Sequence, residues 1–106
     1  MADNIGMISG GSETIPTLIK KKTLNSGSST SIQIDISKNY IVTIGQISSN
    51  DTISNSICQL SIINGVINTI IQSSTIYSKC SLTENNLTIK NTNTVGYSLV
   101  YTILEM

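Results

Sequence analysis

The chain contains no histidine, arginine, tryptophan or phenylalanine, and only 11% of its 106 residues are charged. Without histidine, neither a Ser–His nor a Cys–His pair can activate a nucleophile. The carboxylates are scattered along the sequence, and the one pair that a glycosidase could use as two facing acids is Asp35 with Glu84. Because both belong at solvated positions, we expect a protein that is not an enzyme.

The chain also has no net charge that could attract a charged partner. The six basic and six acidic residues give a net charge of zero, so nothing attracts the chain to nucleic acid or to an acidic membrane. There is no run of about 18 apolar residues to form a membrane-spanning helix, and the N-terminus lacks the features of a signal peptide. We expect synthesis in a cytosol, no membrane partner and no nucleic-acid partner.

Cysteine is limited to Cys58 and Cys80, and the sequence has no CxxC motif. Two thiols without a histidine do not complete a tetrahedral zinc site, so no metal and no cofactor are expected. In a reducing cytosol both residues are expected to be thiols. A disulfide between neighbouring strands is the alternative.

What fills the chain instead is isoleucine alternating with Ser, Thr, Asn and Gln in short runs. In residues 30–37, for example, Ile32, Ile34 and Ile36 are predicted to point inward. No window has helical periodicity, and turns rich in Ser, Asn and Gly separate the runs. The predicted strands are 17–24, 30–37, 40–47, the two strands of a hairpin over 56–73, 75–82, 86–91 and 96–105. This spacing predicts an all-β fold, a small antiparallel β-sandwich or, alternatively, a barrel-like sheet.

The hairpin is centred on Asn64-Gly65, because both residues tolerate the positive φ that a type I′ turn requires. A two-residue loop fixes the register of the two strands. The predicted cross-strand pairs are Ile63–Val66, Ile62–Ile67, Leu60–Thr69 and Cys58–Ile71.

The last strand is apolar on both faces, which suggests burial on both sides. In a small sandwich, the second side is often covered by another subunit. A central strand covered by a loop of the same chain is the alternative. The predicted oligomer interface consists of Tyr97, Leu99, Val100, Tyr101, Ile103 and Leu104.

Two further groups of residues have open interpretations. Lys20, Lys21 and Lys22 either keep an edge strand soluble or contact an acidic partner or a phosphate. The tyrosines either stack on sugar rings or belong to the core with the hydroxyl at its rim. They are Tyr40, Tyr77, Tyr97 and Tyr101.

Residues 1–16 differ from the β-domain of residues 17–106. They contain three glycines and the single proline, Pro16, and their apolar residues are isolated from one another. This composition predicts an extended N-terminal arm. Such arms bind by adding backbone hydrogen bonds to a sheet edge while alternate side chains fill pockets. The predicted partner-binding residues are Ile5, Met7, Ile8 and Ile15.

A polar arm, a β-module rich in Ser, Thr, Asn and Ile, and the final Y-x-L-x-Y-x-I strand (97–103) together resemble small bacteriophage virion proteins. One similar group is the capsid decoration proteins, compact and typically trimeric β-domains whose N-terminal arm adds to the capsid lattice. Another is the tail-fibre tip modules, which end in strands comparable to "NTNTVGYSLVYTI" (91–103). No fibre shaft or coiled-coil heptad precedes the β-module here.

The resemblance implies a structural protein of a phage or phage-tail-like particle. It implies a homotrimer bound to a larger virion lattice, a capsid or a tail, after assembly in the cytoplasm of the bacterial host. A receptor- or glycan-binding tail-fibre tip module is the alternative.

Deletion of residues 2–15 tests the arm. We expect the truncated chain to keep its β-rich circular dichroism spectrum and to melt within a few degrees of the full chain. It should no longer co-purify with particles, because its attachment segment is gone. A large loss of thermal stability would instead make the arm an edge strand of its own domain. Undiminished particle binding would place the attachment surface on the β-domain.

Overall fold

A computed structural model describes residues 15–48, 53–94 and 96–106. Ile5, Met7 and Ile8 of the predicted arm lie outside these residues. Within the described ranges the chain forms strands, turns and bends, and none of these segments is an apolar helix that could cross a membrane.

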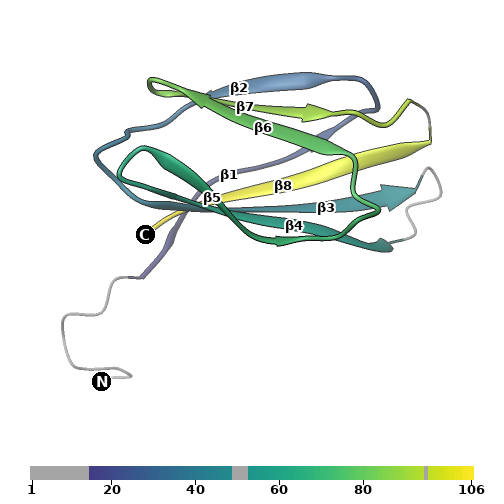
Figure 1. The fold of residues 1–106 in the computed structure, drawn as a ribbon, viewed down its shortest axis with the longest axis horizontal. Coiled ribbons are helices and arrows are strands. Elements are labelled where there is room, and N and C mark those ends of the chain that lie inside the picture. Colours follow the sequence, from purple (N-terminus) through teal and green to yellow (C-terminus); the bar gives the residue numbers. More distant parts are fainter. Residues whose placement is uncertain (1–14, 49–52, 95) are drawn as a thin grey trace.

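Two antiparallel sheets pack face to face as a β-sandwich, as the sequence predicted (Figure 1). One sheet has five strands in the order β1-β8-β3-β4-β5, and the other has three in the order β2-β7-β6. The sheets do not close into a barrel, because β1, β5, β2 and β6 each leave a free edge. The strands are β1 (Thr17–Leu24), β2 (Ser29–Gln33), β3 (Tyr40–Ser48), β4 (Ile53–Ile63), β5 (Val66–Gln72), β6 (Ser78–Thr83), β7 (Asn86–Asn91) and β8 (Tyr97–Glu105).

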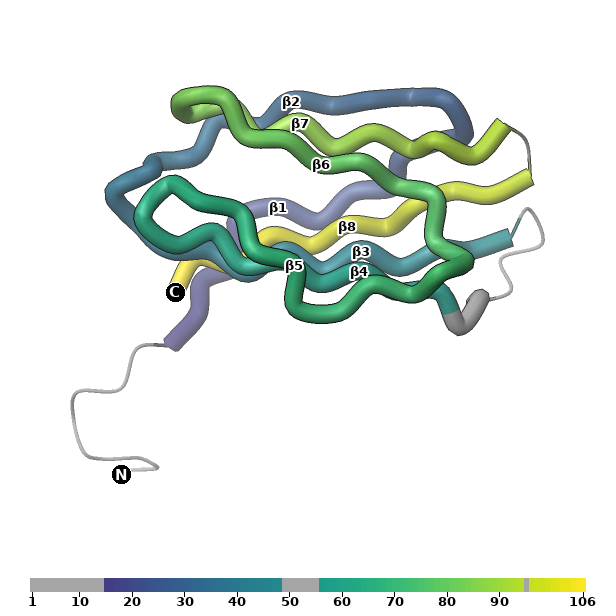
Figure 2. The backbone as a smooth tube through the Cα atoms, in the orientation of Figure 1, coloured from purple at the N-terminus to yellow at the C-terminus, as the bar shows by residue number. Residues whose placement is uncertain are grey.

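The chain passes between the two layers four times, after β1, β2, β5 and β7 (Figure 2). The predicted strand 30–37 is longer than the observed strand β2, because the chain turns toward β3 after Gln33. A side-chain oxygen of Asp35 accepts hydrogen bonds from the backbone N–H of Ser37 at 2.9 Å and from its hydroxyl at 2.6 Å. These bonds form a turn and hold the pKa of the Asp35 carboxyl below its ordinary value. As a result, β2 ends at Gln33, and Ile36 is exposed instead of facing inward.

The Asn-Gly hairpin joins β4 to β5 through two residues of positive φ, 53° at Asn64 and 73° at Gly65. The predicted register is confirmed from the turn as far as Leu60–Thr69. Beyond it, the pairing of Cys58 with Ile71 is wrong, because a bulge in β5 shifts the register and Cys58 pairs with Gln72. One extra residue reverses the alternation of faces. Ile71 is therefore 48% exposed instead of buried beside Cys58.

Between the sheets lies one contiguous apolar core. Tyr40 is part of it, and its hydroxyl accepts a hydrogen bond from the backbone N–H of Asp35 at 2.9 Å. Burial of this kind supplies about 25 cal/mol per Å² of apolar surface. The core residues are Leu24, Ile32, Ile34, Tyr40, Val42, Ile44, Cys58, Leu60, Ile62, Ile76, Leu87, Ile89, Leu99, Tyr101 and Ile103.

Both cysteines are free thiols in the structure, Cys58 within the core and Cys80 packed against it. Burial raises the pKa of Cys58, and a hydrogen bond with Ser78 opposes that rise. Burial, with a smaller contribution from the neighbouring Cys58, raises the pKa of Cys80 from 9.0 to about 12. Both thiols are therefore neutral and poorly nucleophilic at neutral pH.

The raised pKa of Cys80 predicts how stability depends on pH. The folded chain holds the proton more tightly than the unfolded chain, so the stabilisation is complete below about pH 9 and is lost as the pH rises toward about 12. We expect the free energy of unfolding of the natural chain to fall, relative to that of Cys80→Ala, by up to about 1.4 kcal/mol per pH unit in this range. Urea unfolding of both proteins at a series of pH values measures the difference. Parallel pH dependences would show that Cys80 does not titrate differently in the two states.

Candidate functional site

The outer faces of the two sheets differ in character. In the three-stranded sheet, residues that alternate with the buried Ile32, Leu87 and Ile89 point away from the core. All of them are polar, as expected of a face in contact with water. They are Ser29, Ser31, Gln33, Lys79, Ser81, Thr83, Asn86, Thr88 and Lys90.

The outer face of the five-stranded sheet is mixed, with apolar side chains at about half of its described positions and mostly uncharged polar ones such as Thr43, Gln59 and Thr102 at the others. Val100 lies opposite Gly45 and Thr23 in the register, and Leu104 lies opposite Ile41 and Leu18. Across its described residues, this face carries one charged side chain, Lys21, at the edge formed by β1. Its apolar residues are Leu18, Ile41, Ile47, Ile57, Ile63, Val66, Ile71, Val100 and Leu104.

The residues of the predicted oligomer interface lie on opposite faces of β8. Leu99, Tyr101 and Ile103 lie in the core of their own chain, with at most 2% of their surface exposed, so they have no surface to offer a second chain. Val100 and Leu104 are half-buried on the outer face. Tyr97, the sixth predicted residue, is 41% exposed but lines the cavity described below, so we restrict the interface proposed for the outer face of β8 to Val100 and Leu104.

The remaining predicted positions are dispersed. Ile15 precedes β1 and is 83% exposed. Lys20, Lys21 and Lys22 lie on β1, which is an edge strand of its sheet. This position agrees with the interpretation that the lysines protect an edge.

Asp35 and Glu84, the only pair of acids that a glycosidase could use, lie in exposed turns. Asp35 follows β2, and Glu84 lies between β6 and β7 with a φ of 53°. No group of three or more Cys, Asp or Glu residues that could hold a metal ion occurs among the residues that the structure describes.

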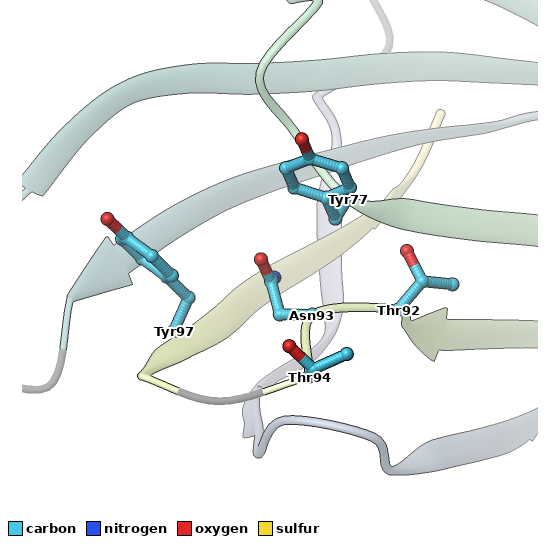
Figure 3. Close-up of a pocket in the computed structure, with 5 residues that line it drawn as sticks. All are labelled: Tyr77, Thr92, Asn93, Thr94 and Tyr97. Atoms are coloured by element: carbon cyan, nitrogen blue, oxygen red, sulfur yellow. The ribbon is translucent and has the colours of Figure 1, made fainter.

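The four tyrosines separate into two pairs. Tyr40 and Tyr101 belong to the core, whereas Tyr77 and Tyr97 are 56% and 41% exposed. The exposed pair lines a cavity of about 380 Å³ at one end of the sandwich (Figure 3). Tyr77 comes from the segment between β5 and β6, and Tyr97 is the first residue of β8. The other lining residues are Thr92, Asn93 and Thr94, which follow β7.

Beneath this cavity, the fully buried side chain of Asn91 connects the two sheets. Its amide nitrogen Nδ2 donates to the backbone oxygens of Leu24 at 2.9 Å and Tyr97 at 3.0 Å. Its oxygen Oδ1 accepts from the backbone N–H of Asn93 at 2.9 Å and from the Nδ2 of Asn93 at 2.8 Å. Every polar group of this buried amide therefore has a partner, as its burial requires.

The amide of Asn93 is held by a second buried amide, that of Gln46. The Nδ2 of Asn93 donates to Gln46 Oε1 at 2.9 Å, and the same oxygen accepts from the backbone N–H of Tyr77 at 3.3 Å. Gln46 Nε2 donates to the backbone oxygen of Thr75 at 3.2 Å. Because backbone N–H groups can only donate and backbone oxygens can only accept, these bonds fix the orientation of Asn91 and Gln46, and through them that of Asn93.

Sequence reasoning overlooked this network, although a signal for it exists. Gln46 continues the inward series Tyr40, Val42 and Ile44 of β3, and Asn91 continues the inward series of β7. A polar residue at an inward position of a strand indicates a buried hydrogen-bond partner. The position of that partner depends on the tertiary fold.

Comparisons with known proteins provide no relative: no protein family, no curated protein and no solved structure matches this chain.

Replacement of Asn91 tests the network. In Asn91→Asp, an oxygen replaces the donor and faces two backbone oxygens in a buried site, so we expect a loss of about 3 to 5 kcal/mol in the free energy of unfolding. The control Asn86→Asp, on the polar outer face, should change it by less than about 0.5 kcal/mol. Urea denaturation at pH 7 measures both. A loss below about 1 kcal/mol for Asn91→Asp would show that water replaces the missing bonds.

Proposed function

We propose that this protein is a non-enzymatic structural component of a phage or phage-tail-like particle. In this proposal, the β-domain assembles with copies of itself, as a homotrimer by analogy with the capsid decoration proteins that it resembles, and the N-terminal arm fastens it to a capsid or tail lattice. The assignment to a particle is supported by the resemblance of residues 17–106 to small virion proteins. The self-association is supported by the surface of the β-domain.

The observation that carries the self-association is the contrast between the two outer faces. A sheet face in water normally carries polar residues, as the three-stranded sheet does. The five-stranded sheet instead carries apolar side chains at about half of its described outward positions, and Ile57 and Val100 lie on either side of Gly45 in one row of the register. Apolar side chains gathered on one outer face of a small domain mark an interaction surface.

We assign a second copy of the same chain to this face. Its only charge among the described residues is Lys21 at the edge, so the face has no charge pattern to match a strongly charged partner. A face that carries apolar side chains and almost no charge can pack against further copies of the chain. In a trimer, one part of this face would contact a different part of the surface of the next copy.

The alternative is a receptor- or glycan-binding tip module. It requires a recognition site separate from the sheet face, and the cavity between Tyr77 and Tyr97 is the feature that favours it. The two functions are compatible, because the cavity is lined by residues just before β6, just after β7 and at the start of β8, and none of them belongs to the apolar residues of the outer sheet face.

Sedimentation of Ile57→Lys tests the assembly. At tens of micromolar, we expect the natural chain to sediment as a fixed multiple of 11.4 kDa. The variant should sediment as a monomer, because the lysine would bury a charge in the interface. The control Ser81→Lys places the same charge on the polar outer face and should assemble as the natural chain does. A monomeric natural chain, or an Ile57→Lys variant that assembles normally, would contradict the proposed interface.

A further inference from the structure

The cavity at the end of the sandwich is lined by one hydrogen-bond acceptor that has no donor among the described residues. Both protons of the Asn93 amide nitrogen are used, one by Asn91 Oδ1 and one by Gln46 Oε1. The Oδ1 of Asn93 is therefore left over, and it accepts no hydrogen bond within the described part of the chain. Asn93 is only 7% exposed, so the unused acceptor belongs to a residue that is almost entirely buried. A buried acceptor is normally satisfied.

The unused oxygen points between two aromatic rings. Figure 3 shows the amide of Asn93 between Tyr77 and Tyr97, with its oxygen directed into the space that the rings flank. The face of an aromatic ring carries partial negative charge, so it attracts the weakly positive C–H bonds of an apolar surface. A group that fills this space should therefore offer a hydrogen-bond donor at its edge and C–H bonds on its faces.

None of the described residues that line the cavity carries a formal charge. They are two tyrosines, two threonines and one asparagine. Among them a phosphate or a carboxylate would find no cation, and an amine would find no anion. The hydroxyls of Thr92 and Thr94 can each donate and accept, which suits a ligand that carries several hydroxyls.

The size of the site sets a limit on its ligand. A volume of about 380 Å³ is near the lower end of the roughly 300–1,000 Å³ of small-ligand pockets. One or two sugar rings fit such a volume. The network of Asn91 and Gln46 also fixes Asn93 before any ligand arrives, so binding loses little side-chain entropy at this residue.

From these features we propose that the cavity binds a pyranose ring of a neutral glycan. One face of the ring packs on Tyr77 or Tyr97, and a ring hydroxyl donates to Asn93 Oδ1. The hydroxyls of Thr92 and Thr94 bond the neighbouring hydroxyls of the sugar. This site is separate from the proposed assembly surface and does not depend on it.

The test is a titration of the full chain followed by NMR, with the methyl glycosides of glucose, galactose, mannose and N-acetylglucosamine as probes. We expect saturable shifts for at least one sugar, centred on Tyr77, Asn93 and Tyr97, with an affinity in the millimolar range. Such an affinity suits one ring with few contacts. Adenosine serves as a further probe, because a flat base also stacks on tyrosine.

Variants of the exposed tyrosines localise the binding. Tyr77→Ala and Tyr97→Ala should each weaken the affinity about tenfold, because each removes an aromatic face. Tyr77→Phe and Tyr97→Phe keep the ring and should bind within a few-fold of the natural chain. Ser81→Ala, on the polar outer face of the three-stranded sheet, should leave the sugar affinity unchanged.

Three results would overturn the proposal. One is that none of the four sugars binds saturably. Another is that the folded alanine variants bind as well as the natural chain does. The last is that adenosine binds at this site while the sugars do not. The oligomeric state, measured separately by sedimentation, tests the proposed assembly on its own.

Discussion

The structure depends on the buried amide of Asn91. Apolar packing holds the two sheets together, but it has no direction and permits them to slide against each other. Asn91 adds a directional bond at the end of β7, where its side chain reaches the last residue of β1 and the first residue of β8. Its backbone N–H and C=O meanwhile bond the turn before β2, at Ser28 and Gly27. One residue thus joins the two sheets at the places where the chain crosses between them.

The cavity depends on the same residue. Asn91 Oδ1 and Gln46 Oε1 use both protons of the Asn93 amide, which leaves the oxygen of Asn93 as the group that faces the space between Tyr77 and Tyr97. The polar network that holds the end of the sandwich together therefore also determines which atom its cavity presents. The amide of Asn91 and both protons of the Asn93 amide have partners, so the support of this oxygen is rigid, and a rigid support favours selective binding.

The two outer sheet faces differ from each other. The face of the three-stranded sheet is polar, whereas the face of the five-stranded sheet carries apolar side chains at about half of its described positions and is the one that we propose for contact with other copies. The bulge in β5 adds to this contrast, because it moves Ile71 from the core side to the outer face. The lining residues of the cavity belong to neither outer face, so the proposed assembly and the proposed ligand binding would not compete.

The sequence by itself determined the all-β class, the strands 17–24 and 86–91 to the residue, and the turn at Asn64-Gly65. These features follow from side-chain alternation and turn chemistry, which act over a few neighbouring residues. Only the tertiary structure decided which face of β8 belongs to its own core, because alternation does not say what covers each face. It also brought Tyr77, Asn93 and Tyr97 together from segments that are separate in the sequence. The sequence indicated polar residues at the inward positions 46 and 91, but their partners are set by sheet packing, which joins residues far apart along the chain.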